Sequence, residues 1–364
     1  MCTRNKKRRL AEMSIKEKQY YESLMGHTPF SFFKNLSSNI EIFDYFEDYA
    51  VDLVKSTCEA INQEFPISYE YLINPKINAG CVLENNVNKI IVFEGVIFSL
   101  YSYAHKLVTH YKTVRMKKEQ ENSDGCTIFV EETRDGLKLN TEIELSYRIE
   151  DNILAEYIAM LAVKFIIAHE IGHILSGHLL YRSSYGEEKV EFHMTSSGIS
   201  KVSMVNLQCM EIDADSFAAC ELVSSLEKEL LYDGKLLNII ESQDEIYKIA
   251  GCAIQCVFYL IGKLQNNWRN NTPEKYSHPP AITRVNLLLD VCRGVISDDK
   301  KWGGILQGCV IAERNLNDYF KIGNDSMDQF ILDMIGFDKY GQHLLGIWRD
   351  LKKELAEYTK LPFI

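Results

Sequence analysis

The sequence predicts a mainly helical α+β fold with a small β-sheet or hairpins and a helical C-terminal region. Apolar residues recur at helical spacing in several long segments. Short runs rich in Val, Ile, Thr and Tyr are separated by turn residues. Residues 305–359 again have helical spacing. These observations favour a fold in which helices outnumber strands.

The first half of the chain alternates helical and strand-like segments. Asn85 and Asn86 separate two strand-like runs and indicate a turn. Arg134, Asp135 and Gly136 separate two more, which predicts a hairpin. The expected elements are a helix over 38–64, a strand over 68–74, strands at 81–83 and 90–93, a helix over 96–111, a polar connection over 113–124, and hairpin strands at 126–132 and 137–147.

The second half is expected to be almost wholly helical. Asp151 is placed to cap a long helix, and Pro280 or Ala281 is placed to start another, because proline is tolerated in a first turn. The expected elements are a helix over 152–180, a polar loop over 183–200, helices over 205–229 and 244–266, an irregular segment over 269–280, and the final helical region.

Composition excludes several classes of protein. The 364 residues are 46% hydrophobic and 25% charged, which provides a sizeable core. The net charge of -11 argues against a dedicated nucleic-acid binder. The basic run from Arg4 to Arg9 is read as a solvated tail, with a nuclear address or an anionic-surface contact as alternatives. With no export signal and no apolar run of about 18 to 20 residues, a cytoplasmic protein without a transmembrane segment is expected, and its ten cysteines are expected to be reduced.

The strongest chemical signal is the pentapeptide from His169 to His173, His-Glu-Ile-Gly-His. Two histidines four apart on a helix project from one face, so both imidazoles can bind one Zn²⁺. The glutamate between them, Glu170, can then take a proton from the water at the open coordination position. The flanking residues are apolar, and burying these ionisable groups is costly unless a metal or partners satisfy them.

A catalytic zinc site needs a third protein ligand, for which the chain offers three candidates. His178 follows the motif too closely to share its face on a continuing helix, and His193 lies in the polar loop. Glu211 is favoured, because it and Asp215 share a helix face four residues apart. Asp215 can accept the other ring N–H of a ligating histidine. Asp213 is expected to point elsewhere, toward the surface.

Four motifs in order resemble the gluzincin peptidases, in particular the HtpX and CAAX-prenyl-protease type. They are Ile77-Asn78-Ala79 with the strand 90–93, the His169 to His173 motif, Glu211 to Asp215, and the segment from Ser277 to Arg284. The resemblance covers roughly residues 75 to 290. It implies a zincin-like core, a zinc cofactor and a protein or peptide substrate. It also implies that His278 and Arg284 lie near the active site, where His278 would stabilise an oxyanion and Arg284 would orient it or bind acidic groups.

The chain also departs from that type. It has no transmembrane helices, carries an insertion over 111–150, and has no recognisable counterpart after residue 300. The expected organisation is an N-terminal segment 1–37, a metallopeptidase domain 38–300 and a helical region 301–364. More loosely, the layout is similar to the Lit-type phage-exclusion peptidases, which suggests one narrow protein target and a defence or regulatory role.

Two alternatives stay open from the sequence. The metal site could serve an inactive zinc-binding or interaction protein, if a fourth protein ligand such as His178 or His193 closed it. The output could instead come from the C-terminal helices of a regulatory module. For a peptidase, the substrate is expected to pair as an added strand with the strand that ends at Phe93 or with the hairpin at 126–147.

Overall fold

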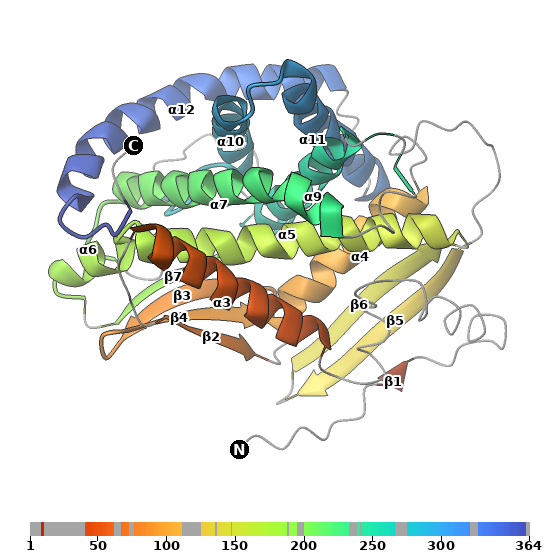
Figure 1. Ribbon diagram of the computed structural model, residues 1–364, viewed down its shortest axis with the longest axis horizontal. Helices are drawn as coiled ribbons and strands as arrows, with labels where there is room; N and C mark the ends of the chain where they lie inside the picture. The colour runs from red at the N-terminus through yellow and green to blue at the C-terminus, as the bar shows by residue number, and fades with distance from the viewer. Residues whose placement is uncertain are drawn as a thin grey trace.

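The computed structural model describes residues 9–10, 41–61, 67–72, 76–110, 125–134, 137–146, 148–187, 189–194, 200–232, 239–240, 242, 244–265, 275–320 and 327–361. Over these residues the protein is mainly helical, with a small mixed sheet and a separate hairpin sheet, as the sequence predicts. The helix α5 (Ile149–Leu175) runs through the centre (Figure 1). A small sheet lies on one side of it and a layer of helices on the other.

The bounds of the described elements follow the periodicity closely in most segments. The helices are α3 (Glu41–Ile61), α4 (Glu94–His110), α5 (Ile149–Leu175), α6 (His178–Ser184), α7 (Met204–Tyr232), α9 (Glu245–Gln265), α10 (Ala281–Val295), α11 (Asp299–Phe320) and α12 (Met327–Leu355). The strands are β1 (Arg9–Leu10), β2 (Ile67–Leu72), β3 (Ala79–Glu84), β4 (Val87–Phe93), β5 (Gly125–Arg134), β6 (Leu137–Ser146) and β7 (Val190–His193).

The sheet under α5 has the strand order β2-β4-β3-β7. Strands β3 and β4 form the expected hairpin, and Asn85 and Asn86 at its turn both have positive φ (51° and 63°), as a two-residue type I′ turn requires. Strand β2 is parallel to β4, and β7 is antiparallel to β3. The strand ending at Phe93 is therefore internal, so the expectation that it offers a free edge is wrong.

The segment expected to be a loop over 183–200 contains a strand and the end of a helix. β7 adds to β3 with Cys81 opposite Phe192. Val190 and Phe192 are buried, whereas Glu191 and His193 are only partly covered. This two-residue alternation gives the short strand one apolar face, and the strand forms the edge of the sheet.

The predicted hairpin is confirmed as β5 and β6, which pair antiparallel with Ile128 opposite Ile143. Strand β1 pairs with the other side of β5. The turn residues 135–136 and the polar connection 113–124 lie outside the described residues. This sheet contacts α4 through β6 and so lies beside the central helices.

The long helix that carries the motif differs from its expected bounds at both ends. Asp151 does not cap it, because the N-cap position is Arg148; Asp151 accepts a hydrogen bond from the Ser146 hydroxyl at 3.0 Å instead. The helix ends at Leu175, not near residue 180. Gly177, with φ 79°, turns the chain into the separate helix α6. An added Cβ at Gly177 would lie 2.4 Å from the carbonyl carbon of Tyr358, so the C-terminal segment fixes this turn.

Two helices are long and apolar enough to cross a membrane by length and composition alone, Glu150–Leu175 and Glu245–Leu264. Their most apolar windows are 100% and 94% buried inside the protein. Both are core helices in this fold, since α5 packs against α4, α7 and α9 and the sheet.

The C-terminal helices pack onto the same core. Helices α9 and α11 approach closely at Gly251 and Gly308, where an added Cβ would meet backbone atoms at 2.1 Å. Helix α12 packs on α7 and α10 (Figure 1). Cys252 and Cys256 are fully buried in α9, as expected for small core residues.

Candidate metal centre

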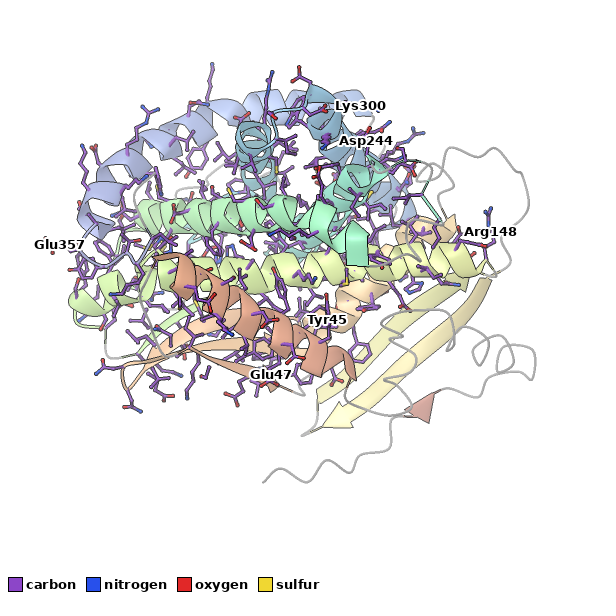
Figure 2. The ribbon with its side chains drawn as sticks, viewed as in Figure 1. Tyr45, Glu47, Arg148, Asp244, Lys300 and Glu357 are labelled. Carbon is purple, nitrogen blue, oxygen red and sulfur yellow. The ribbon has the colours of Figure 1, made fainter. Side chains whose placement is uncertain are left out.

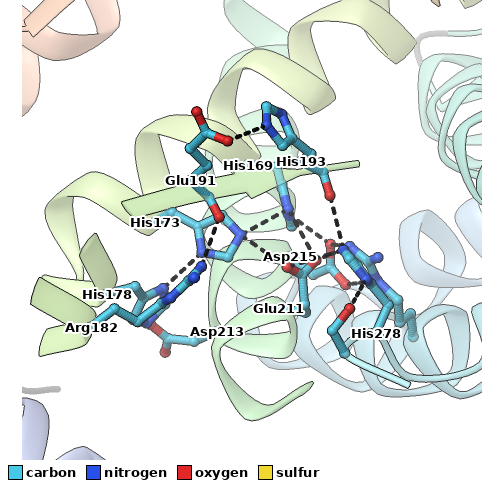
Figure 3. A network of polar contacts seen from close by, with 12 residues as sticks. His169, His173, His178, Arg182, Glu191, His193, Glu211, Asp213, Asp215 and His278 are labelled. Carbon is cyan, nitrogen blue, oxygen red and sulfur yellow. Dashed lines mark hydrogen bonds and ion pairs between the residues drawn. The ribbon is translucent and has the colours of Figure 1, made fainter. Parts of the chain in front are cut away.

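Three side chains from two helices converge beside the centre of the sheet. Helix α5 supplies His169 and His173, and α7 supplies Glu211 (Figure 3). The two Nε2 atoms are 3.1 Å apart, and each lies 3.5 Å from an oxygen of Glu211. Among the described residues, these three form a buried group whose donor atoms could hold one metal ion.

The spacing of these donors fits a tetrahedral zinc site. Zinc binds imidazole nitrogen and carboxylate oxygen at about 2.0 to 2.2 Å, so ligand atoms at two corners of its tetrahedron lie about 3.3 to 3.5 Å apart. The two nitrogens are 3.1 Å apart, and the two carboxylate oxygens lie 3.5 Å from one nitrogen each, Oε2 from His169 and Oε1 from His173, which is close to those edges. Two imidazoles and a carboxylate are also a donor set that zinc accepts in catalytic sites.

Small residues allow α5 and α7 to approach closely enough for this convergence. An added Cβ at Gly172 would lie 3.1 Å from the Cα of Ala214 and 3.2 Å from its carbonyl oxygen. Gly172 follows Glu170 by two residues on α5, and Ala214 lies about one turn after Glu211 on α7. The contact between these two small residues therefore brings Glu211 within reach of both histidines.

The protonation of the group follows from its burial and its carboxylates. Burial lowers the pKa of His173 to about 3, which keeps its imidazole neutral and able to bind a metal. Burial also disfavours a charged His169, but Asp215 and Glu211 outweigh it and raise the pKa of His169 to about 10. Burial opposes the ionised Glu211, yet the surrounding imidazoles lower the pKa of that carboxyl well below its usual range. In the absence of a metal, a proton on His169 thus offsets the charge of Glu211.

Glu170 belongs to the same cluster but is not one of the three donors. It is 2% exposed, and burial is the main cause that raises its pKa to about 7, against the opposing effect of His169. Its carboxylate accepts a hydrogen bond from the thiol of Cys81 in β3, a cysteine whose role the sequence does not reveal. A carboxyl with a pKa near neutrality can exchange protons at physiological pH, as a general base must.

A second layer of ionic contacts holds the ligands. The Nδ1 atom of His169 lies 3.0 Å from Asp215. Arg284 donates two hydrogen bonds to Asp215, both at 2.7 Å, and lies 3.4 Å from Glu211. This bidentate pair is fully buried and fixes the carboxylate that in turn orients His169.

His278 closes the group on another side. Its Nε2 donates to the carbonyl oxygen of His193 at 3.1 Å and lies 3.4 Å from Glu211. Ser277 contacts its Nδ1 at 3.0 Å. The sequence motif from Ser277 to Arg284 and the end of β7 are therefore brought to the metal group (Figure 3).

His173 is held by residues that sequence reasoning assigned elsewhere. The Nδ1 atoms of His173 and His178 are 3.0 Å apart, and the Nε2 of His178 lies 3.3 Å from Asp213. Phe192 of β7 stacks on the His173 ring at 4.2 Å. Asp213 does not point to the surface away from the site, as was expected, because Gly177 turns His178 back toward it. That glycine is the one sequence signal that could have indicated the contact.

Every sequence-predicted site residue lies in this cluster except His193, whose ring faces Glu191 and which contributes only its carbonyl. His178 lies on the side of His173 opposite the metal group. All these residues fall within residues 97–303, which match the family model described as Peptidase U49, over more than half of the chain. No curated protein and no solved structure matches the chain.

Proposed function

We infer that this chain, which belongs to the Peptidase U49 family, is a zinc-dependent peptidase with its metal held by His169, His173 and Glu211. One observation carries the proposal: two imidazole nitrogens and a carboxylate converge, buried, closely enough to hold one metal ion, and an additional carboxyl, Glu170, lies beside them. Three protein ligands leave a fourth position for water or substrate, as in catalytic zinc sites. Family membership supports peptide hydrolysis as the reaction.

A zincin-like, gluzincin core of the HtpX and CAAX-prenyl-protease type forms part of the proposal. The motif helix α5, the ligand helix α7 and strand β3 against α5 support it. In this organisation residues 38–300 are the metallopeptidase domain and 301–364 the helical C-terminal region. We also propose a cytoplasmic location and a narrow protein target, as in the Lit-type peptidases.

The chemistry is divided between the metal and the protein. Zinc, when bound, supplies a Lewis acid that polarises the peptide carbonyl and makes the attacking water more acidic. The carboxylate of Glu170 accepts the proton that this water loses and delivers it to the leaving amine. A pKa near 7 suits both steps, because the group is neither too weak a base nor too weak an acid at neutral pH.

The remaining polar residues position the reactants. His278 carries its donated proton on Nε2, which allows it to stabilise the oxyanion of the attacked carbonyl. Asp215 keeps the tautomer of His169 that leaves Nε2 free for the metal. Arg284 acts through Asp215 and is a positioning residue rather than a substrate contact.

The substrate is proposed to align with β7, because β7 is an edge strand of the sheet whereas β4 is an internal strand. The Met194 amide donates to Ala79, so strand alternation directs the carbonyls of Glu191 and His193 outward. Arg182 and His278 donate to these two carbonyls, at 2.7 and 3.1 Å. An added peptide strand would take over these contacts.

Proline substitution tests this edge. Glu191→Pro removes an outward N–H without breaking the ladder to β3, and is expected to raise KM while zinc content stays at one per chain. Phe192→Pro is the matched control, since it breaks the ladder and should lower both zinc content and stability. An unchanged KM in Glu191→Pro would remove β7 as the substrate edge.

Metal analysis with a cleavage assay tests the function itself. Zinc content would be measured by mass spectrometry in wild type, Glu170→Gln and Glu150→Gln, beside proteome-wide detection of new protein termini. Glu150 is an exposed glutamate in the first turn of the same helix and serves as the matched control. One zinc in all three, with new termini from wild type and Glu150→Gln only, is expected. Absence of zinc from wild type would refute the proposal.

An inactive zinc-binding protein is the second candidate, and the burial of the site favours it. Each residue of the metal group is at most 8% exposed, so substrate entry needs some opening. X-ray absorption spectroscopy separates the two candidates. An open catalytic site has three protein ligands plus one light scatterer that azide or phosphate displaces. A closed site has a fourth protein ligand, for example His278, whose Nε2 lies 3.4 Å from Glu211.

A further inference from the structure

A separate pocket of about 370 Å³ lies between α6 and the end of α12. Its volume is at the lower end of the range of about 300 to 1,000 Å³ for small-ligand sites. It is lined by three tyrosines, two glutamates, a serine and a lysine: Tyr181, Tyr185, Tyr358, Glu354, Glu357, Ser184 and Lys353. Figure 2 labels Glu357 at this end of the molecule. None of these residues belongs to the metal group or its second layer.

The tyrosines form steeply inclined aromatic walls. Tyr181 is buried at the centre, with its ring 5.1 Å from Tyr185 at 58° and 5.7 Å from Tyr358 at 82°. The Tyr181 hydroxyl donates to Glu354 at 2.6 Å, which fixes that ring. Tyr185 is 47% exposed, so much of its surface remains available. Aromatic rings that line one cavity can hold an organic cation over their π faces.

The charge of the pocket has the sign that a cation requires. Glu354 lies in the last turn of α12, where the helix dipole is also negative, and Glu357 lies in the turn that follows the helix. Lys353 opposes them, but it pairs with Asp350 at 2.8 Å, so its charge is offset. The two glutamates therefore leave a net negative pocket beside the aromatic rings.

The pocket is directly connected to the end of the metal-bearing helix. The carbonyl of Tyr358 packs against Gly177, and the Lys360 amide donates to the carbonyl of Leu175, the last residue of α5, at 2.8 Å. His178, which contacts His173, begins the helix α6, which carries Tyr181 and has Tyr185 as its C-cap.

We propose that this pocket binds the guanidinium or ammonium group of a basic side chain in the polypeptide that the enzyme cleaves. The tyrosine rings cover the cation and the two carboxylates neutralise it. Its role as a substrate exosite rests on the proposed peptidase function, whereas the binding itself does not.

Binding is tested on the Glu170→Gln protein, which cannot turn over a substrate, by saturation-transfer NMR with capped tripeptides. The probes are acetyl-Ala-Arg-Ala-amide, its lysine analogue and, as reference, acetyl-Ala-Ala-Ala-amide; methylguanidinium alone reports the contribution of the free cation. Tyr185→Ala and Glu357→Gln alter exposed side chains, so folding is expected to be retained. Glu59→Gln removes one exposed charge on α3, remote in sequence from the pocket, and is the matched control.

The arginine and lysine peptides are expected to bind more tightly than the alanine reference. Each single variant should weaken binding about two- to five-fold, and the double variant about ten-fold, while Glu59→Gln has no effect. In active protein, the double variant should raise KM for a basic substrate and leave kcat unchanged. Equal binding of the arginine and alanine peptides, or retention of binding by the double variant, overturns the proposal. Tight binding of methylguanidinium with no gain from the peptide context would assign the pocket to free cations and overturn the exosite role.

Discussion

Removing the guanidinium of Arg284 is expected to destabilise the protein strongly, because it leaves the buried Asp215 carboxylate with only the His169 ring as a partner. Both side chains are at most 3% exposed, and two hydrogen bonds of 2.7 Å join them. Breaking a buried pair by removing one member costs about 3 to 5 kcal/mol. Arg284→Met should therefore lower the free energy of unfolding by that amount.

The opposite variant, Asp215→Asn, is expected to cost less. Arg284 then keeps Glu211 as a partner at 3.4 Å, so the loss is closer to the value of about 1.5 to 3 kcal/mol for hydrogen bonds to charged groups. The double variant Arg284→Met with Asp215→Asn removes both charges together. Its total loss should be smaller than the sum of the single losses by about 2 kcal/mol or more.

Urea unfolding of the four proteins, with zinc in fixed excess, measures this coupling. Additive losses, within about 0.5 kcal/mol, would refute the interpretation of Arg284 and Asp215 as one unit. Zinc affinity is a second readout, because it separates the loss of the contact to His169 from a general loss of stability. Asp215→Asn should weaken it by about 10- to 100-fold, because His169 loses the partner that fixes its tautomer.

The pair also predicts how stability depends on pH. Burial alone would raise the pKa of Asp215, but Arg284 outweighs it and lowers the pKa below its usual value of 3.8. A carboxyl with a lowered folded pKa stabilises the protein above its unfolded pKa. This contribution should be lost as the pH falls through the folded pKa, and the acid limb should flatten in Asp215→Asn.

Two further predictions follow from the titration of the site. Since the pKa of His169 is about 10 without metal, zinc must displace its proton. The apparent zinc affinity, measured by chelator competition, should therefore fall up to about tenfold per pH unit as the pH is lowered from about 8 to about 6.5. A zinc affinity that does not change with pH would contradict His169 as a ligand. Since the pKa of Glu170 is raised to about 7 and its ionised form is the base, kcat/KM should decline with unit slope below about pH 7; a profile that stays level to about pH 5 would exclude Glu170 as the base.

The elements that the sequence predicts well are those whose signal is local. The motif histidines share a helix face because they are four residues apart, and Asn85 and Asn86 indicate their turn by tolerating positive φ. Glu211 could be selected because one helix face also carried Asp215. In each case the decisive interactions lie within a few residues of chain, or repeat at the helical period.

The elements that the sequence misses depend on distant contacts. Strand β7 has only four residues, and it becomes a strand by pairing with β3, where Gly80 leaves room for it: an added Cβ would lie 2.3 Å from the carbonyl oxygen of Phe192. The inward position of Asp213 depends on the turn that brings His178 back to His173. The pattern of apolar residues within a single segment cannot predict such contacts, because they join residues from different segments.

The end of α5 is held by contacts from the C-terminal segment, and these contacts determine how the role of the C-terminal region can be tested. Deleting residues 305–364 would remove the Tyr358 and Lys360 contacts on the motif helix together with α12, so lost activity would not separate a regulatory output from a damaged site.

Gly177→Ala is a sharper change. Its left-handed conformation costs about 1 to 2 kcal/mol with a side chain, and displacing Tyr358 loses one hydrogen bond worth about 1 kcal/mol. A loss of about 2 to 3 kcal/mol in unfolding free energy with weaker zinc binding is expected, because the turn positions His178 against His173. Gly346→Ala, at an open position of α12, is the control. Equal zinc affinity in both variants would show that the turn supports the fold but not the metal centre.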